Sequence, residues 1–155
     1  MSLSETIKTD LKTSLKEKRE FETGVLRLLA SVFQNKEIEK KGKGLEPRLS
    51  DEEIIEILTR EAKKRKEAAE IYKQGNRDDL AKKEIEESEI IKKYLPEQLG
   101  EEEITKIIEG IIQKSGVVNQ NDFGRVMGEA MKELKGKADA KLVSEIVKKK
   151  LETQL

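Results

Sequence analysis

Apolar residues recur every three or four positions along almost the whole sequence, and this spacing constrains the fold more than any other feature. These residues are scarce, because 35% of the 155 residues are hydrophobic while 41% are charged. A period of three to four places the apolar side chains on one face of an α-helix and the charges on the other. No segment longer than Val117–Val118 suggests a strand. The sequence therefore predicts an all-α protein.

Residues 1–96 are predicted to form an N-terminal helical domain. The first helix carries the apolar stripe Leu3, Ile7, Leu11 and Leu15. The second helix reaches about Glu39 and carries the stripe Phe21, Val25, Leu28, Leu29, Val32 and Phe33. Residues 41–49 contain two glycines and a proline, which predict an exposed loop. Ser50 and Glu53 have the Ser-x-x-Glu spacing of a capping box, which predicts the start of a third helix.

The third and fourth helices are predicted to form a long antiparallel hairpin that turns at Gly75. The buried side of the third helix is predicted to comprise Ile54, Ile55, Leu58, Ala62, Ala69 and Tyr72. Glu61 and Arg65 are four residues apart, which predicts an ion pair on the solvent side of this helix. The basic run 63–66 is likewise predicted to be a solvated surface. The fourth helix covers residues 78–94 and is expected to turn Leu80, Ile85, Ile91 and Leu95 inward.

A second domain is predicted for residues 97–155, because Leu95 precedes Pro96 and is pushed out of helical geometry. Its first helix has the stripe Ile104, Ile107, Ile108, Ile111 and Ile112. A second helix covers residues 121–134 and is expected to stop at Gly136. Asp139 is expected to cap the third helix, whose buried residues are predicted to be Leu142, Val143, Ile146, Val147 and Leu151. This domain is therefore predicted to be a three-helix unit.

Several kinds of chemistry are excluded by composition. The chain has no cysteine and no histidine, so it has neither thiolate metal sites nor catalytic triads built on imidazole. Residues 41–49 lack the spacing of a phosphate-binding loop. The acidic runs 51–53 and 101–103 lie in first helical turns, where each carboxylate gains about 0.3–1 kcal/mol from the helix dipole. We therefore expect no metal, no cofactor and no catalytic residues.

No apolar run has the length of a transmembrane helix, and the first ten residues lack the pattern of a signal peptide. We therefore expect no membrane association and a cytoplasmic location. Lysines and arginines balance aspartates and glutamates overall, but residues 1–48 and 124–155 each carry a net charge of +3. The cationic ends leave the middle of the chain acidic.

The helix at residues 121–135 is unusual because two glycines share one face with three cations. On a helical wheel, Gly124 and Gly128 lie beside Arg125, Lys132 and Lys135, opposite the apolar side. Each interior glycine costs about 0.8–1 kcal/mol relative to alanine, so the pair requires a reason. Close packing against another helix of the chain is one reason. Close approach of a polyanion backbone, with the cations on its phosphates, is the other.

Four segments of the sequence are distinctive: GRVMG and LKGKADAKLV near the C-terminus, VLRLLASVFQNKEIEKKG near the N-terminus, and KYLPEQL in the middle. Together they resemble the GatB/YqeY family. The whole chain resembles stand-alone YqeY-like proteins, and its C-terminal part is similar to the tail domain of the B subunit of tRNA-dependent amidotransferase. The resemblance implies a tail that contacts tRNA, whereas kinase and amidase chemistry belong to domains that this chain lacks.

The family motif falls on Gly124, Arg125, Met127, Gly128, Gly136, Lys137, Ala138 and Asp139. The resemblance implies that Arg125 and Lys137 touch phosphate, that the glycines permit close approach and that Asp139 caps a helix. Ala140 departs from the proline that tail domains often have there. With the cations of the wheel, the predicted tRNA-binding residues are Gly124, Arg125, Gly128, Lys132, Lys135, Gly136 and Lys137.

The sequence thus predicts a non-catalytic accessory protein whose C-terminal domain contacts tRNA, or an enzyme such as a tRNA synthetase or an amidotransferase. No DNA partner is expected. The alternative is a protein–protein adaptor that docks a partner helix on the Gly124/Gly128 face. The resemblance also implies carbon–nitrogen ligase activity with glutamine as the amido donor, but we expect none from the isolated chain because the catalytic domains are absent.

Overall fold

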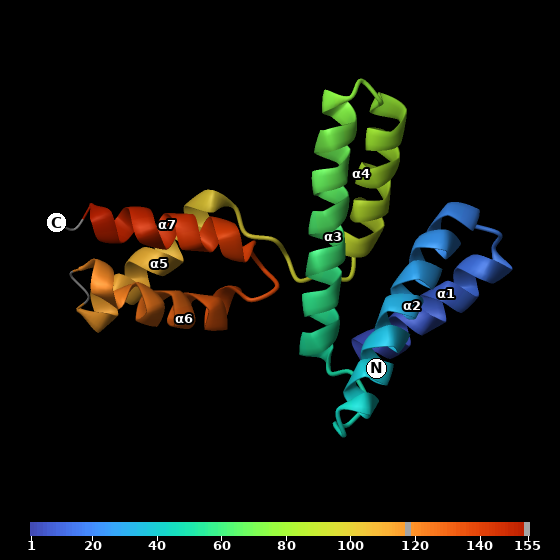
Figure 1. The fold of residues 1–155 in the computed structure, drawn as a ribbon, viewed down its shortest axis with the longest axis horizontal. Helices are drawn as coiled ribbons and strands as arrows, with labels where there is room; N and C mark the ends of the chain where they lie inside the picture. Colours follow the sequence, from blue (N-terminus) through green and yellow to red (C-terminus); the bar gives the residue numbers. More distant parts are fainter. Residues whose placement is uncertain (117–118, 154–155) are drawn as a thin grey trace. The chain divides into compact units, whose positions relative to one another are not determined.

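The computed structural model describes residues 1–116 and 119–153, and its elements are all helical (Figure 1). The described part of the chain divides into two compact units, Met1–Leu95 and Pro96–Leu155. The prediction of an all-α protein is confirmed for the described residues. Val117–Val118, the longest segment that suggested a strand, lies outside them.

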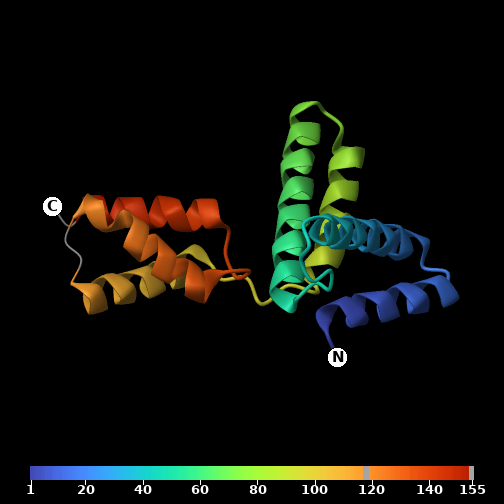
Figure 2. The same ribbon diagram turned by 60° about the horizontal axis from the view of Figure 1, so that its bottom comes forward.

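The N-terminal unit consists of two helix pairs. Its helices are α1 (Leu3–Lys16), α2 (Glu20–Gly42), α3 (Asp51–Gln74) and α4 (Asp78–Lys92). α1 packs along α2, and α3 packs along α4 (Figures 1 and 2). The predicted capping box forms, since Glu53 N donates to Ser50 Oγ and Ser50 N donates to the Glu53 carboxylate. The core of this unit comprises Ile7, Val25, Leu26, Leu29, Phe33, Leu49, Ile54, Ile57, Leu58, Ala62 and Ile91.

The predicted loop at residues 41–49 is shorter than expected. α2 continues to Gly42, and Leu49 is buried rather than exposed. In the last turn of α2, the Lys40 ammonium donates to Arg48 O at 3.0 Å and to the Glu53 carboxylate at 2.9 Å. These contacts hold the last turn of α2 against the start of α3.

The buried face of α2 is rotated from the predicted stripe. Phe21 and Leu28 were expected to be inside, but they are 41% and 46% exposed, whereas Leu26 is fully buried. Leu15 of α1 and Ile85 of α4 are also exposed despite their positions in predicted stripes. Apolar residues surround more of α2 than one face can bury, and the neighbouring helices decide which of them are covered.

The Glu61–Arg65 pair is present, but the prediction that it faces solvent is wrong. Arg65 Nη1 donates to Glu61 Oε2 at 2.7 Å, and both residues are buried. Arg65 Nε also donates to Glu87 Oε2 of α4 at 3.1 Å. α4 covers this side of α3, so Arg65 belongs to a buried ion network and not to a solvated basic surface.

α4 ends at Lys92, two residues before the predicted Tyr94. The Tyr94 hydroxyl donates to Asp10 Oδ2 of α1 at 2.6 Å. Burial of the phenol and this hydrogen bond to a carboxylate raise the pKa of Tyr94 above its usual range. The end of the hairpin is therefore tied to the first helix.

The C-terminal unit consists of α5 (Glu101–Ser115), the short 3-10 helix η1 (Gln120–Asp122), α6 (Phe123–Leu134) and α7 (Ala140–Glu152). Each of the three α-helices packs against the other two (Figure 2). Asp139 caps α7, as predicted, by accepting from Lys141 N at 3.2 Å. The core is built from Ile104, Ile108, Ile111, Ile112, Val126, Ala130, Leu134, Ala138, Val143, Ile146, Val147 and Leu151.

Candidate nucleic-acid interface

The two faces predicted for the glycine-bearing helix are separated in the structure. The apolar side of α6 is inside, with Val126, Ala130 and Leu134 each at most 1% exposed. Gly124 and Gly128 are both exposed on the other side. α6 therefore anchors itself in the core with one face and leaves the other face for solvent or a ligand.

The open space over the glycines bears on the first of the two reasons proposed for them, which is packing within the chain. A Cβ atom added at Gly124 or at Gly128 would meet no heavy atom of the described chain within 4 Å. Within that part of the chain, close packing against another helix is therefore not the reason for either glycine. α6 begins at Phe123, so Gly124 lies in its first turn and Gly128 is the unfavourable interior residue. Both are at a surface that the described chain leaves uncovered.

Three cations accompany the glycines. Arg125 is held loosely, because Nη2 lies 3.4 Å from Ser115 O and 3.7 Å from Asp122 Oδ1 and its side chain is 54% exposed. Exposed pairs of this kind contribute little to stability, so the guanidinium can exchange its partner for a phosphate. Lys132 and Lys135 are exposed and have no ion pair among the described residues.

A groove runs along one side of α6, between this helix and α5. α6 lines the groove with Glu129, Lys132 and Glu133. α5 lines it with Lys106, Ile107, Gly110, Ile111 and Lys114. The groove therefore combines three lysines with two carboxylates, and the carboxylates weaken its attraction for a polyanion.

The α5 wall of this groove repeats the glycine-and-cation arrangement that the sequence analysis recognised only in α6. Lys106, Gly110 and Lys114 are spaced by four residues and share one helix face. A Cβ atom at Gly110 would also meet no described atom within 4 Å. In the sequence, this arrangement corresponds to one interior glycine centred between two lysines. The sequence analysis missed it because it considered only the isoleucine stripe of this helix.

Gly136 differs from the other predicted glycines, because it is buried. Its φ of 78° lies in the left-handed region, which favours glycine. Its carbonyl accepts from Gln98 Nε2 at 2.7 Å, and the next carbonyl, of Lys137, accepts from Leu99 N at 2.9 Å. Gly136 therefore shapes the turn before α7, while the Lys137 side chain beside it is exposed.

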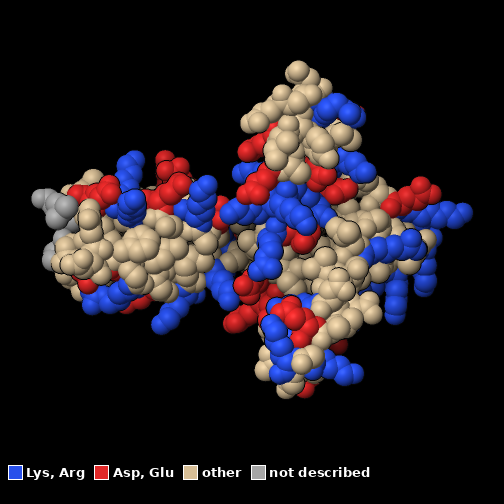
Figure 3. Space-filling view, in the orientation of Figure 1, with Lys and Arg blue, Asp and Glu red and all other residues tan. Residues whose placement is uncertain are grey.

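A band without charges crosses the visible face of the C-terminal unit, with charged side chains gathered along both edges (Figure 3).

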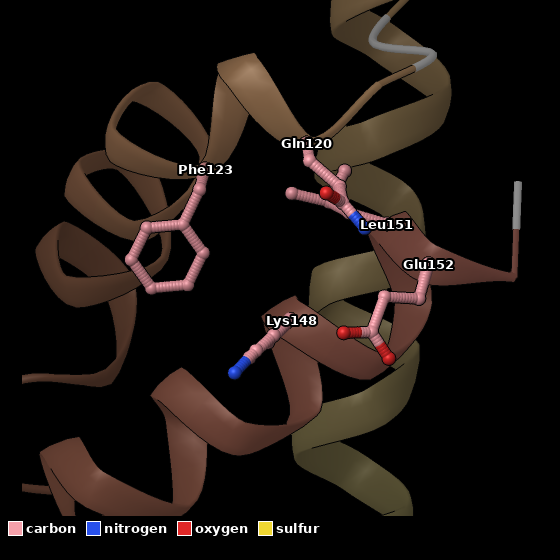
Figure 4. Close-up of a pocket in the computed structure, with 5 residues that line it drawn as sticks. All are labelled: Gln120, Phe123, Lys148, Leu151 and Glu152. Carbon is pink, nitrogen blue, oxygen red and sulfur yellow. The ribbon is translucent and has the colours of Figure 1, made fainter. Parts of the chain in front are cut away.

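A hollow between the start of α6 and the end of α7 is lined by Gln120, Phe123, Lys148, Leu151 and Glu152. Figure 4 shows the Phe123 ring and the Lys148 ammonium facing the same opening. Phe123, Met127 and Met131 are partly buried and pack against the core from α6.

Other site classes find no support in the described residues. They contain no group of three acidic residues that could hold a metal ion. None of the described helices is both long enough and apolar enough to cross a bilayer. The exposed glycine-and-cation faces of α5 and α6 are therefore the strongest candidate for a functional surface.

Comparison with known proteins agrees with the motifs in the sequence. A family model described as Yqey-like protein matches residues 4–151. The chain belongs to the YqeY-like family. A relative in Clavispora lusitaniae, altered inheritance of mitochondria protein 41, is 30% identical over 133 residues, which cover 86% of this chain and 74% of the relative.

The YqeY-like chain is also similar to part of a larger amidotransferase polypeptide. The E subunit of glutamyl-tRNA(Gln) amidotransferase in Methanocaldococcus jannaschii is 49% identical over 57 residues, which cover 34% of this chain and 9% of that polypeptide. Its counterpart in Methanobrevibacter smithii is 44% identical over 61 residues, or 37% of this chain and 10% of the counterpart. The predicted resemblance to the GatB/YqeY family is confirmed. Family and similarity together fit a non-catalytic helical accessory protein.

Proposed function

We propose that this chain is an accessory protein that binds tRNA through the exposed glycine-and-cation faces of its C-terminal unit. The observation that carries the proposal is the open space over Gly124 and Gly128 beside Arg125, Lys132 and Lys135. Gly128, in the interior of α6, costs the helix about 0.8–1 kcal/mol relative to alanine, and Gly124, in its first turn, costs less. Because the described chain gains no packing from them, an external ligand that approaches the backbone accounts for them best.

The spacing of the cations suits a nucleic-acid backbone. Arg125 and Lys132 are two helical turns apart, or about 10 Å along α6. Lys106 and Lys114 are eight residues apart, or about 12 Å along α5. Both spacings are near the separation of every second phosphate of a strand, at about 6 Å per step. Gly128 and Gly110 lie between the members of each pair and present no side chain to hold the strand away.

The class of nucleic acid comes from the similarity to the amidotransferase polypeptide, whose name includes glutamyl-tRNA(Gln). The similar segment is about one tenth of that polypeptide, so the proposal extends to contact with tRNA and not to the amidation reaction. Association with an amidotransferase or a tRNA synthetase, in the cytoplasm, belongs to the same proposal. Binding would place the tRNA for a catalytic partner.

Charge reversal at two predicted phosphate contacts tests the proposal. Arg125→Glu with Lys132→Glu should weaken tRNA binding severely and reduce the log–log salt slope by about 1.5–2, since two phosphate contacts are lost. The matched control is Lys141→Glu with Lys149→Glu, which changes net charge equally on exposed positions of α7. Fluorescence anisotropy with labelled tRNA across a salt series measures the affinity and the salt slope of each double variant. Equal weakening by the two double variants would mean that bulk charge, and not this face, binds tRNA.

The adaptor alternative is a partner helix docked on the Gly124/Gly128 face. The partly buried Met127 and Met131 lie on the edge of the apolar side nearest to this face, and methionines are common at adaptable protein interfaces. Salt separates the alternatives. Binding to tRNA should fall steeply as salt rises, whereas docking of an apolar helix should change little. Partner binding that does not change with salt, and that is lost in Met127→Glu, would favour the adaptor.

A further inference from the structure

A second uncovered surface lies on α2 in the N-terminal unit, far along the sequence from the proposed tRNA face. Leu15, Phe21 and Leu28 are 46%, 41% and 46% exposed, and together they border two hollows. The two hollows flank Gly24, and both are lined by Glu20 and Gly24. We name this surface, with its three apolar residues and Gly24, the α2 groove.

The two hollows are lined by different residues. Phe21 and Leu28 line one hollow from α2, opposite Arg65 and Lys83 of the α3–α4 hairpin. Leu15 lines the other hollow. A Cβ atom at Gly24 would meet no described atom within 4 Å, so the backbone of α2 is accessible at the centre of the groove.

The polar groups beneath the groove are already satisfied. Arg65 donates to Glu61 and Glu87, and the buried Thr23 hydroxyl donates to Ser14 Oγ at 2.8 Å. A ligand in the groove therefore gains little from hydrogen bonds with its base. Its affinity must come from the exposed apolar side chains and from unpaired charges along the edges.

Those edges are mainly cationic. Lys18, Arg27 and Lys83 line the two hollows and form no ion pair among the described residues. Glu20 is the one lining carboxylate that is likewise unpaired there. The unpaired charges thus leave an excess of two positive charges around an apolar centre.

We infer that the α2 groove docks an amphipathic helix of a partner protein, with apolar residues on one face and carboxylates beside them. Phe21, Gly24 and Leu28 follow helical spacing, so a second helix can lay an apolar ridge along them and approach closely at the glycine. Carboxylates on the flanks of that helix would meet Lys18, Arg27 and Lys83. A second copy of this groove would bring cations against cations, and a nucleic-acid strand would set phosphates against Leu15 and Leu28. This inference is independent of the proposed tRNA function.

Synthetic helices test the inference directly. One labelled peptide of about 18 residues carries leucines at positions i, i+3, i+4 and i+7 of each repeat, flanked by glutamates, and its counterpart has lysine at every glutamate position. Fluorescence anisotropy with the full chain should give binding of the acidic peptide at least about tenfold tighter than that of the basic one. Equal binding of the two peptides, or binding of neither, overturns the inference.

Variants locate the site. Leu28→Glu should weaken the acidic peptide by about tenfold or more, since it adds a like charge and removes an apolar contact. Ile38→Glu is the matched control on the same helix, because Ile38 is 61% exposed and lines neither hollow. Gly24→Leu should block docking by bulk, and since its surroundings are open, thermal melting should show a folded protein.

Separate experiments test the other possible occupants of the α2 groove. A labelled single-stranded RNA of about 12 nucleotides that binds the chain and loses affinity in Leu28→Glu but not in Ile38→Glu would overturn the inference in favour of RNA. Self-association in sedimentation that is abolished by Leu28→Glu would overturn it in favour of a second copy. Equal weakening of the acidic peptide by both glutamate variants would place its binding elsewhere.

Discussion

The two units of this chain bury their interiors in different ways. The buried polar residues of the described chain are all in the N-terminal unit: Ser14, Thr23, Glu61, Arg65 and Ser88. The core of the C-terminal unit is apolar throughout, and its cations are at the surface. Charges in the first unit therefore serve partly to hold helices together, whereas charges in the second are available to ligands. The same residue type, arginine, has opposite expected roles at positions 65 and 125.

Substitution of Arg65 and of Arg125 should show the largest difference in stability between the two units. Arg65→Leu leaves the buried Glu61 and the partly buried Glu87 without their partner, and we expect a loss of about 3 kcal/mol or more in the free energy of unfolding. Arg125→Leu breaks only an exposed pair and should cost about 0–1 kcal/mol. Urea denaturation of the full chain measures both. A comparable loss in the two variants would remove the distinction between the units.

Glycines within the C-terminal unit sharpen the comparison further. Gly136→Ala forces a side chain into a buried position with φ of 78°, and it should destabilise the protein by about 1–2 kcal/mol. Gly124→Ala with Gly128→Ala should instead stabilise it by about 1 kcal/mol, mostly from the interior position 128, because alanine is the better helix former and the space is open. Thermal melting should give shifts of opposite sign. Destabilisation by the α6 substitutions would reveal a packing role for these glycines.

The helix start at Ser50 has a smaller, pH-dependent contribution. Hydrogen bonds from Ser50 and the ammonium of Lys40 lower the pKa of Glu53 below its usual 4.5. A carboxylate with a depressed folded-state pKa contributes its full stability above the unfolded pKa and loses it as pH falls through the folded value. Ser50→Ala should therefore cost about 1 kcal/mol at pH 7 and less at pH 3. A cost that is the same at both pH values would contradict this linkage.

The sequence predicted what depends on neighbouring residues and missed what depends on distant ones. The Ser50 capping box, the Asp139 cap and the apolar side of α6 follow from local spacing, and all are present. The burial of Arg65 depends on Glu87, which is 22 residues away on another helix. Spacing alone likewise did not reveal which apolar residues of α2 would be covered.

In the candidate site too, the sequence predicted some features, and others could be seen only in the structure. The wheel grouped Gly124 and Gly128 with the cations of α6, but only the structure excludes packing of the described chain over them. The groove that joins Lys132 to Lys106 and Lys114 requires two helices to be placed side by side. The buried left-handed turn at Gly136 was not distinguishable from the exposed glycines by residue type.

The glycine face is tested most directly by tRNA titration of Gly128→Leu in parallel with thermal melting. Because the space over Gly128 is open, the variant should melt at the wild-type temperature or higher. The added bulk should nevertheless weaken tRNA binding by about tenfold while leaving the salt slope nearly unchanged, since no phosphate contact is removed. Undiminished tRNA binding in a stable Gly128→Leu protein would contradict the account, because the glycine would then have no part in the approach of RNA.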